Sequence, residues 1–320
     1  MNQPLKILRL PSLALDVVFD QMALEEIFKL SKCSAKTQAL MKQFTRRRSY
    51  DASVKLDYSS SYTISAKYGW EGREINSKMF DCIGFNFQVS QKALMQEIFK
   101  MLDLFRPTTS LDIQCGNWGV EAWVSTCSML NLKLAKVVVR TLMGHVNIKQ
   151  YKCALRTFKD ASSLTFLVTP PEDIRLEDKD VPRFTCDSIT MASANWITIN
   201  QFFNFFINCR TVLLYSCMFR SNDLYQIIEK WLNREVRLEK VDLFLDVFFS
   251  IVPPIEDIVK DTPYRSEENV KFRNCYKTYP VGYVIQRSDG VEAAICCDRG
   301  LFALGTHFET NMDPPNRALR

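Results

Sequence analysis

Cysteine and histidine are among the side chains of this 320-residue chain that could serve as nucleophiles, general bases or metal ligands, and their arrangement favours none of these chemistries. The eleven cysteines form an odd count without a Cys-x-x-Cys pair, and only His145 and His307 could complete a metal site. A Gly-rich phosphate loop, a His-Glu-x-x-His pair and a Gly-x-Ser-x-Gly motif do not occur. We therefore expect no enzyme activity, no cofactor and no metal, and we expect most of the cysteines to be buried apolar thiols.

The segment at residues 8–44 has the spacing of three short amphipathic helices. Pro11 fixes φ near the value of a first helical turn, so a helix can begin there. Apolar residues then recur at three- and four-residue steps in three stretches: Ala14, Leu15, Val18, Phe19 and Met22; Leu24, Ile27 and Phe28; Cys33, Thr37, Leu40, Met41 and Phe44. A unit of roughly 40 residues rarely supplies a sufficient core alone. It must share its apolar surface with a partner or with the rest of the chain.

This segment resembles an F-box. The resemblance rests on Leu10-Pro11 at its start, on Leu30-Ser31 at the end of the second helix and on the Cys33-Ser34-x-x-Thr37 pattern of the third. It implies a module at residues 4–45 that binds a Skp-type adaptor and, through it, the cullin of an SCF ubiquitin ligase. The residues implied at the adaptor surface, or in the module's own core, are Leu10, Pro11, Leu15, Val18, Phe19, Ile27, Leu30, Ser31 and Cys33. The sequence does not separate these two roles.

Beyond the module, apolar strands alternate with helical patterns every 22 to 30 residues. The predicted strands cover residues 110–114, 135–139, 164–168, 188–191, 211–215 and 240–245. The predicted helices cover residues 92–105, 120–130, 148–161, 198–208 and 222–233. One strand and one helix per repeat is typical of a leucine-rich-repeat-like solenoid. We expect an α+β or α/β fold with an irregular solenoid domain, and a doubly wound open sheet is the competing topology.

A second resemblance covers residues 184–250. The order of Asp187-Ser188-Ile189-Thr190, Asn195-Trp196, Cys209-Arg210-Thr211 and Lys230-Trp231-Leu232 is similar to the type 2 F-box-associated domain of nematode-type F-box proteins. Residues 287–293 are similar to a hairpin turn that those proteins carry. The resemblance implies that residues 46–320 form an F-box-associated domain that holds a protein target, and it assigns no target-contacting residue.

Several residues of this region have predicted structural roles. We expect Trp196 and Trp231 to anchor the core. Ser221-Asn222-Asp223 is predicted to cap a helix, and Asp289-Gly290 is predicted to form the turn of a C-terminal hairpin. The strand spacing predicts that one residue from each strand points into a shared core, namely Ile113, Val138, Phe166, Ile189, Leu213 and Leu243.

Net charge and hydropathy indicate which partners and which location to expect. The net charge of +5 is a mild excess without a concentrated basic face, so we expect no nucleic-acid partner. No signal peptide is recognised and no apolar run approaches the roughly 18 residues of a membrane span, so we expect an intracellular protein, cytoplasmic or nuclear, with no membrane contact. The favoured function is a substrate receptor of an SCF ligase. The alternative is a repeat-type interaction protein outside the ubiquitin system whose N-terminal helices cap the solenoid.

Overall fold

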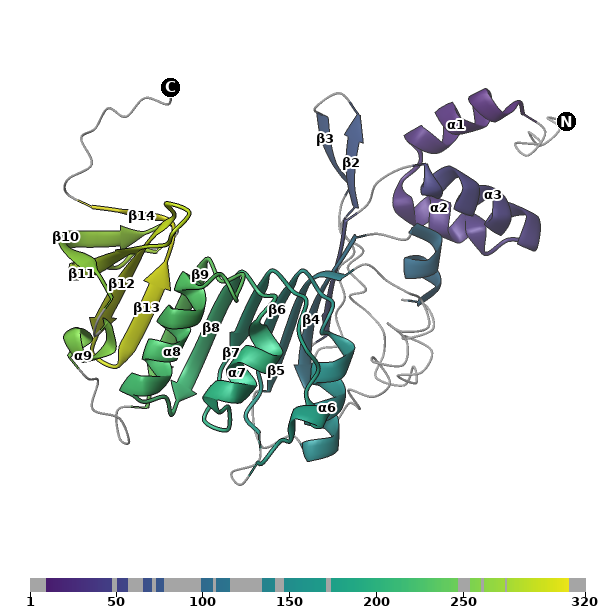
Figure 1. The fold of residues 1–320 in the computed structure, drawn as a ribbon. Helices are drawn as coiled ribbons and strands as arrows, with labels where there is room; N and C mark the ends of the chain where they lie inside the picture. Colours follow the sequence, from purple (N-terminus) through teal and green to yellow (C-terminus); the bar gives the residue numbers. More distant parts are fainter. Residues whose placement is uncertain are drawn as a thin grey trace, which may run out of the picture. The chain divides into compact units, whose positions relative to one another are not determined.

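A division at residue 136 separates a helical unit with short strands, residues 1–136, from a unit built around a mixed sheet, residues 137–320, in the computed structural model (Figure 1). The structure describes residues 10–47, 51–56, 66–70, 73–77, 99–105, 108–115, 134–141, 147–170, 174–246, 254–259, 262–273 and 275–310. The functional boundary predicted near residue 45 therefore lies inside the first unit, which continues to residue 136.

The three N-terminal helices that the apolar spacing predicts are present. They are α1 (Ser12–Gln21), α2 (Leu24–Ser31) and α3 (Ala35–Arg46). Pro11 precedes the first helical residue, as expected from its fixed φ. At the start of α3, the Ser34 hydroxyl accepts a hydrogen bond from the Thr37 N–H at 3.1 Å, and Thr37 Oγ1 accepts one from the Ser34 N–H at 2.9 Å. These reciprocal bonds satisfy backbone donors that a helix start leaves free, so α3 begins at a defined residue.

The helices enclose a small core centred on an edge-to-face contact between Phe19 and Phe44, whose ring centroids lie 5.1 Å apart. A further helix of the same unit, at residues 99–105, packs beside α3. The Thr45 hydroxyl, fully buried, donates a hydrogen bond to the Leu104 carbonyl at 2.7 Å, and the Lys42 ammonium lies 2.5 Å from an Asp103 carboxylate oxygen. The module thus shares part of its surface with a later segment. The remainder of the helix predicted at residues 92–105 lies outside the described residues.

The strands of the first unit form two pairs. β1 (Asp51–Leu56) pairs in parallel with β4 (Thr108–Cys115), and β2 (Ala66–Trp70) pairs antiparallel with β3 (Arg73–Ser77). Of these four, only β4 coincides with a strand that the sequence predicts. The helix predicted at residues 120–130 lies outside the described residues.

In the second unit, parallel strands follow one another in chain order. They are β6 (Ser163–Leu167), β7 (Ser188–Met191), β8 (Thr211–Cys217) and β9 (Lys240–Leu245). β5 (Leu134–Thr141), which begins just before the division at residue 136, comes before β6 in the order of the sheet, and each of these five strands confirms a predicted strand. The helices α6 (Ile148–Thr157), α7 (Ile199–Phe206) and α8 (Ser221–Leu232) also match predicted helices and lie on the same face of the sheet in Figure 1. A short 3₁₀ turn, Asp178–Asp180, precedes β7.

Alternation along these strands divides the sheet into a buried face and a half-buried one. The buried face carries Leu164, Phe166, Ile189, Met191, Val212, Leu214, Val241 and Leu243. The core prediction was right for Phe166, Ile189 and Leu243, and it was wrong for Val138 and Leu213, which are half-buried between buried neighbours. Since side chains alternate, a choice displaced by one residue selects the opposite face. The side chain of Ile113 lies outside the described residues.

The C-terminal part of the second unit is antiparallel. β9 pairs with β13 (Leu301–Gly305), followed across the sheet by β12 (Glu292–Asp298), β11 (Thr278–Gln286), β10 (Tyr264–Phe272) and β14 (Phe308–Glu309). The predicted hairpin joins β11 to β12, with Gly290 at φ +85° in its turn. Because β14 follows β13 after two residues and pairs with β10, the strands curl back on themselves and enclose a second core. A short helix, α9 (Ile255–Val259), precedes β10.

Gly305 lies where β13 closely approaches Phe272 of β10 inside this second core. A Cβ on Gly305 would lie 2.8 Å from the ring of Phe272, which is nearer than real Cβ atoms come to such neighbours. The absent side chain therefore lets β13 and β10 pack together where the sheet curls. Sequence patterns predicted the hairpin and not the enclosing strands β10, β13 and β14.

The structure also tests the predicted roles of the two tryptophans and the predicted cap of α8. Trp231 is fully buried and its indole N–H donates to the Leu238 carbonyl at 3.0 Å, whereas Trp196 is half-buried. The predicted cap was displaced by one residue: Arg220 is the N-cap, Ser221 is already helical, and an Asp223 carboxylate oxygen accepts the Arg220 N–H at 2.9 Å. A carboxylate at the third helical position reaches back to the cap, so the cap itself needs no hydroxyl.

Candidate functional site

The nine residues named for their resemblance to an F-box differ in burial. Leu15, Phe19, Ile27 and Ser31 are buried within the first unit. Leu10, Val18 and Leu30 are half-buried, and Pro11 and Cys33 are exposed. Phe19, only 1% exposed and packed on Phe44, takes the second of the two roles named for it, a place in the module's own core.

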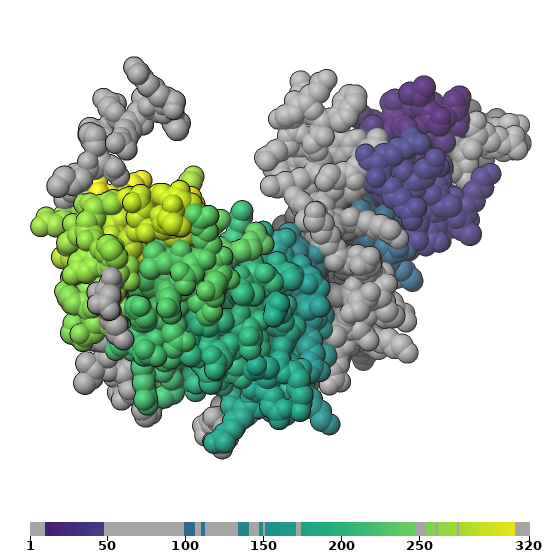
Figure 2. Space-filling view, in the orientation of Figure 1, coloured from purple at the N-terminus to yellow at the C-terminus, as the bar shows by residue number. Residues whose placement is uncertain are grey.

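Two apolar side chains of α1 take the exposed position instead. Leu13 is 80% exposed and Val17 is 62% exposed, and they lie one helical turn apart. Figure 2 shows atoms of α1, in dark purple, at the surface of the first unit. The sequence reasoning followed the stripe of Leu15 and Phe19 and missed this second stripe, although its four-residue spacing is visible in the sequence. A helix with apolar residues on both faces has one face left for a partner.

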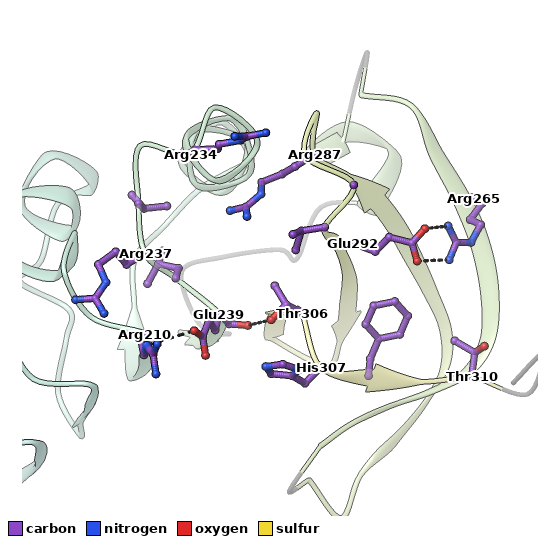
Figure 3. A pocket seen from close by; sticks show the side chains of 15 residues that line it. Arg210, Arg234, Arg237, Glu239, Arg265, Arg287, Glu292, Thr306, His307 and Thr310 are labelled. Atoms are coloured by element: carbon purple, nitrogen blue, oxygen red, sulfur yellow. Dashed lines mark hydrogen bonds and ion pairs between the residues drawn. The ribbon is translucent and has the colours of Figure 1, made fainter. Parts of the chain in front are cut away.

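A second candidate lies in the larger unit, where a cavity of about 860 Å³ opens at one end of the sheet (Figure 3). Its lining residues come from segments far apart in the chain: Arg210, Arg234, Val236, Arg237, Leu238, Glu239, Arg265, Arg287, Gly290, Val291, Glu292, Thr306, His307, Phe308 and Thr310. Five arginines and two glutamates are among them, so the walls carry a surplus of positive charge. The sequence analysis predicted no site here.

Backbone hydrogen bonds hold the floor of this cavity. The Arg210 carbonyl accepts from the Glu239 N–H at 2.8 Å and from the Lys240 N–H at 3.0 Å, where β8 and β9 begin. The Glu239 carbonyl in turn accepts from the Thr306 N–H at 2.9 Å. These bonds join the loops that precede β8 and β9 to the segment between β13 and β14. The backbone of Arg210 is therefore held in place by hydrogen bonds.

The hairpin turn and the end of α8 form the opposite wall. The Arg287 guanidinium lies over the Trp231 ring, 4.9 Å from its centroid, and donates to an Asp289 carboxylate oxygen at 2.9 Å. Arg234 adopts a positive φ of 61°, and its Nε lies 3.4 Å from the same Asp289 carboxylate. Two cations therefore share one carboxylate, and the hydrogen bond from Arg287 lowers the pKa of Asp289 below its ordinary value.

The remaining arginines differ in how far they are neutralised. Arg265 holds Glu292 through two parallel bonds of 2.5 and 2.8 Å, and this bidentate contact lowers the pKa of Glu292. Arg210 lies 3.3 Å from a Glu239 carboxylate oxygen. The guanidinium of Arg237, which is exposed, makes no hydrogen bond or ion pair with the residues that the structure describes. In Figure 3, Arg210 and Arg237 occupy the same side of the cavity.

The described cysteines differ in burial, and most of them are removed from solvent. Cys186, Cys209, Cys217 and Cys296 are buried, Cys153, Cys275 and Cys297 are half-buried, and Cys33 is exposed. Burial raises the pKa of Cys296 and of Cys297 to about 12, which keeps both thiols protonated near neutral pH. The described residues contain no group of three or more metal-ligating side chains, and His145 lies outside them.

None of the helices that the structure describes is both long enough and apolar enough to cross a lipid bilayer. Comparisons of the chain with protein-family models, with curated proteins and with solved structures found no match.

Proposed function

We propose that this chain is a substrate-receptor subunit of an SCF ubiquitin ligase. Residues 4–45 dock a Skp-type adaptor, which connects the chain to a cullin, and the rest of the chain presents a protein target. The observation that carries the proposal is the pair Leu13 and Val17, which are exposed on a helix whose opposite face already fills the module's core. This pair lies within the segment that resembles an F-box.

The proposed contact has the energetics of a small apolar interface. Burial of one Val or Leu side chain contributes about 1.5 to 3 kcal/mol. Two such residues one turn apart, beside the half-buried Leu10 and Val18, supply a continuous apolar strip for a partner. No catalytic group is required of the chain, because a receptor raises the local concentration of target lysines near a thioester carried by other subunits.

The larger unit supplies the proposed surface for the target. Chain-order strands with helices on one face support a solenoid arrangement, in which the face without helices is available. That face carries half-buried residues, among them Tyr215 and Phe244, whose rings stack with centroids 4.5 Å apart. A protein target, rather than a small substrate, suits a surface of this extent.

The test is co-purification of the full chain with a Skp-type adaptor. An isolated fragment of residues 1–48 is less suitable, because it would uncover α3 where Thr45 contacts Leu104. Val17→Asp places a charge on the exposed strip and should weaken adaptor binding by more than about tenfold while the melting temperature stays unchanged. Met218→Asp is the matched control, since it removes an exposed apolar side chain, 44% accessible, from the larger unit.

An adaptor complex that survives both Val17→Asp and Leu13→Asp at wild-type affinity would contradict this docking surface. The alternative, in which the helices only cap a solenoid and the chain works outside the ubiquitin system, would then be favoured. Loss of the complex in Met218→Asp as well would show that the effect is not specific to α1.

A further inference from the structure

The cavity of the larger unit has cationic groups that its own acidic residues do not neutralise. Asp289 pairs with both Arg234 and Arg287, Glu239 pairs with Arg210, and Arg265 pairs with Glu292 and with Glu267. Arg237 has no such partner among the described residues. A cavity with this surplus attracts anions, because each unneutralised guanidinium offers charge together with several N–H donors.

We propose that this cavity binds a phosphorylated segment of a protein, with the phosphate held by Arg237 and Arg210. This proposal adds a class of target, phosphorylated proteins, to the receptor function proposed above. It rests on that function only where it calls the bound protein a ubiquitylation target. Binding itself belongs to the larger unit and needs no adaptor.

The chemistry of the walls favours a phosphate over a lone carboxylate. A phosphomonoester carries a charge of about −1.5 to −2 at neutral pH and has three strong acceptor oxygens. Guanidinium groups match these oxygens in a bidentate geometry, which lysine does not provide. A single carboxylate could satisfy Arg237 alone and would leave the donors of Arg210 that face away from Glu239 unused.

The size and surroundings of the cavity favour a peptide over free phosphate. About 860 Å³ is far more than one phosphate fills, and Val291 and Phe308 add apolar wall. Phe308 lines the cavity from β14, and Thr310 directly follows this strand. Among the described strands, β14 pairs with β10 on one side and has no strand on its other side. Extended peptides bind at such edges through their backbone groups. A nucleic-acid site needs a longer basic stripe and a series of stacking rings, whereas the lining of the cavity contains only two rings, His307 and Phe308, which are adjacent in the chain.

The experiment uses the immobilised full chain and two degenerate peptide libraries that differ only in a fixed central phosphoserine or serine. The phosphoserine library should be retained at least about tenfold more strongly, and added salt should reduce this retention. Inorganic phosphate at millimolar concentration should compete weakly, because it lacks the flanking residues. A library with aspartate at the fixed position should fall between the two.

Arg237→Ala should reduce retention of the phosphoserine library by about tenfold or more without a change in melting temperature, because its guanidinium makes no hydrogen bond or ion pair with the described residues. Arg210→Ala should reduce it further, since Glu239 then faces the phosphate unpaired. Arg183→Ala is the control, because Arg183 is exposed and lies outside the cavity lining.

Equal retention of the two libraries would overturn the proposal, and so would retention that persists in both Arg237→Ala and Arg210→Ala. Inorganic phosphate that binds as tightly as the phosphoserine library would overturn the peptide part and leave a site for a small anion. Adaptor binding is measured separately through Val17→Asp, so a failure here and a failure of the receptor function give different results.

Discussion

The exposed strip of α1 and the cavity of the larger unit present opposite kinds of side chain. On α1, the exposed residues Leu13 and Val17 are apolar and lie beside a core that is already filled by Phe19 and Phe44. In the larger unit, the uncovered groups around the cavity are arginines, while an extensive apolar core lies beneath the sheet. Groups that neither core uses are available to partners, and here they predict two partners of different chemistry.

The two surfaces also differ in how they should respond to conditions. An apolar strip gains its affinity from the removal of water and depends weakly on salt. A guanidinium-lined cavity binds through charge, so its affinity falls as ionic strength rises. The proposed adaptor interface and the proposed phosphopeptide interface should therefore be weakened independently.

The largest effect expected within this comparison is that of Phe19→Asp. Loss of a buried Phe costs about 3 to 5 kcal/mol, and a carboxylate without a partner in the same space adds to that cost. The N-terminal helices should unfold, which amide hydrogen exchange over residues 10–47 of the full chain would detect. Val17→Asp should leave this protection intact. Wild-type protection in Phe19→Asp would show that Phe19 belongs to the surface and that the division between core and surface on α1 is incorrect.

A smaller effect distinguishes the two faces of the large sheet. Leu214 is fully buried and Leu213, its neighbour on β8, is half-buried. Leu214→Ala should lower the free energy of unfolding by about 2 to 5 kcal/mol. Leu213→Ala should lower the free energy of unfolding by about 1 kcal/mol, because a half-buried leucine gains only part of the transfer free energy of a fully buried one. Chemical denaturation of both variants measures the difference, and equal losses would contradict the register of β8.

The smallest effect concerns the pH dependence of one cavity wall. Arg265 lowers the pKa of Glu292, so the contact stabilises the folded state above the unfolded pKa of about 4.3 and is lost as the pH falls through the lower folded value. Arg265 is half-exposed, so we expect about 1 kcal/mol or less. Arg265→Gln should therefore be less stable than the wild type at pH 7, and the difference should shrink as the pH falls through the folded pKa of Glu292. Lys271→Gln, the same change of charge on the same strand, should show no such convergence, and a difference for Arg265→Gln that stays constant throughout an acid titration would rule out this contact as its cause.

Local sequence patterns predicted where helices and strands lie better than they predicted which residues of each strand face the core. Pro11 and the apolar residues spaced three and four positions apart after it predicted three helices, and apolar runs predicted β4 to β9. Both signals are local, because the periods of a helix and of a strand repeat within a few neighbouring residues. Asp289-Gly290 predicted the hairpin because a tight turn needs positive φ. The assignment of Leu213 and Val138 to the core failed, since two adjacent apolar residues give no local signal of which one faces the helices.

The sequence by itself determined that the chain forms three helices followed by alternating strands and helices, and that few histidines are available for catalysis. Tertiary structure alone decided that Phe19 lies inside and Val17 outside, because packing against α3 selects one of two apolar stripes. It alone also brought Arg210, Arg237 and Arg287 to one cavity. Residues so far apart in the chain meet only through the pairing of β9 with β13 and the curl of the strands beyond it, and such pairing depends on non-local contacts that no short pattern contains.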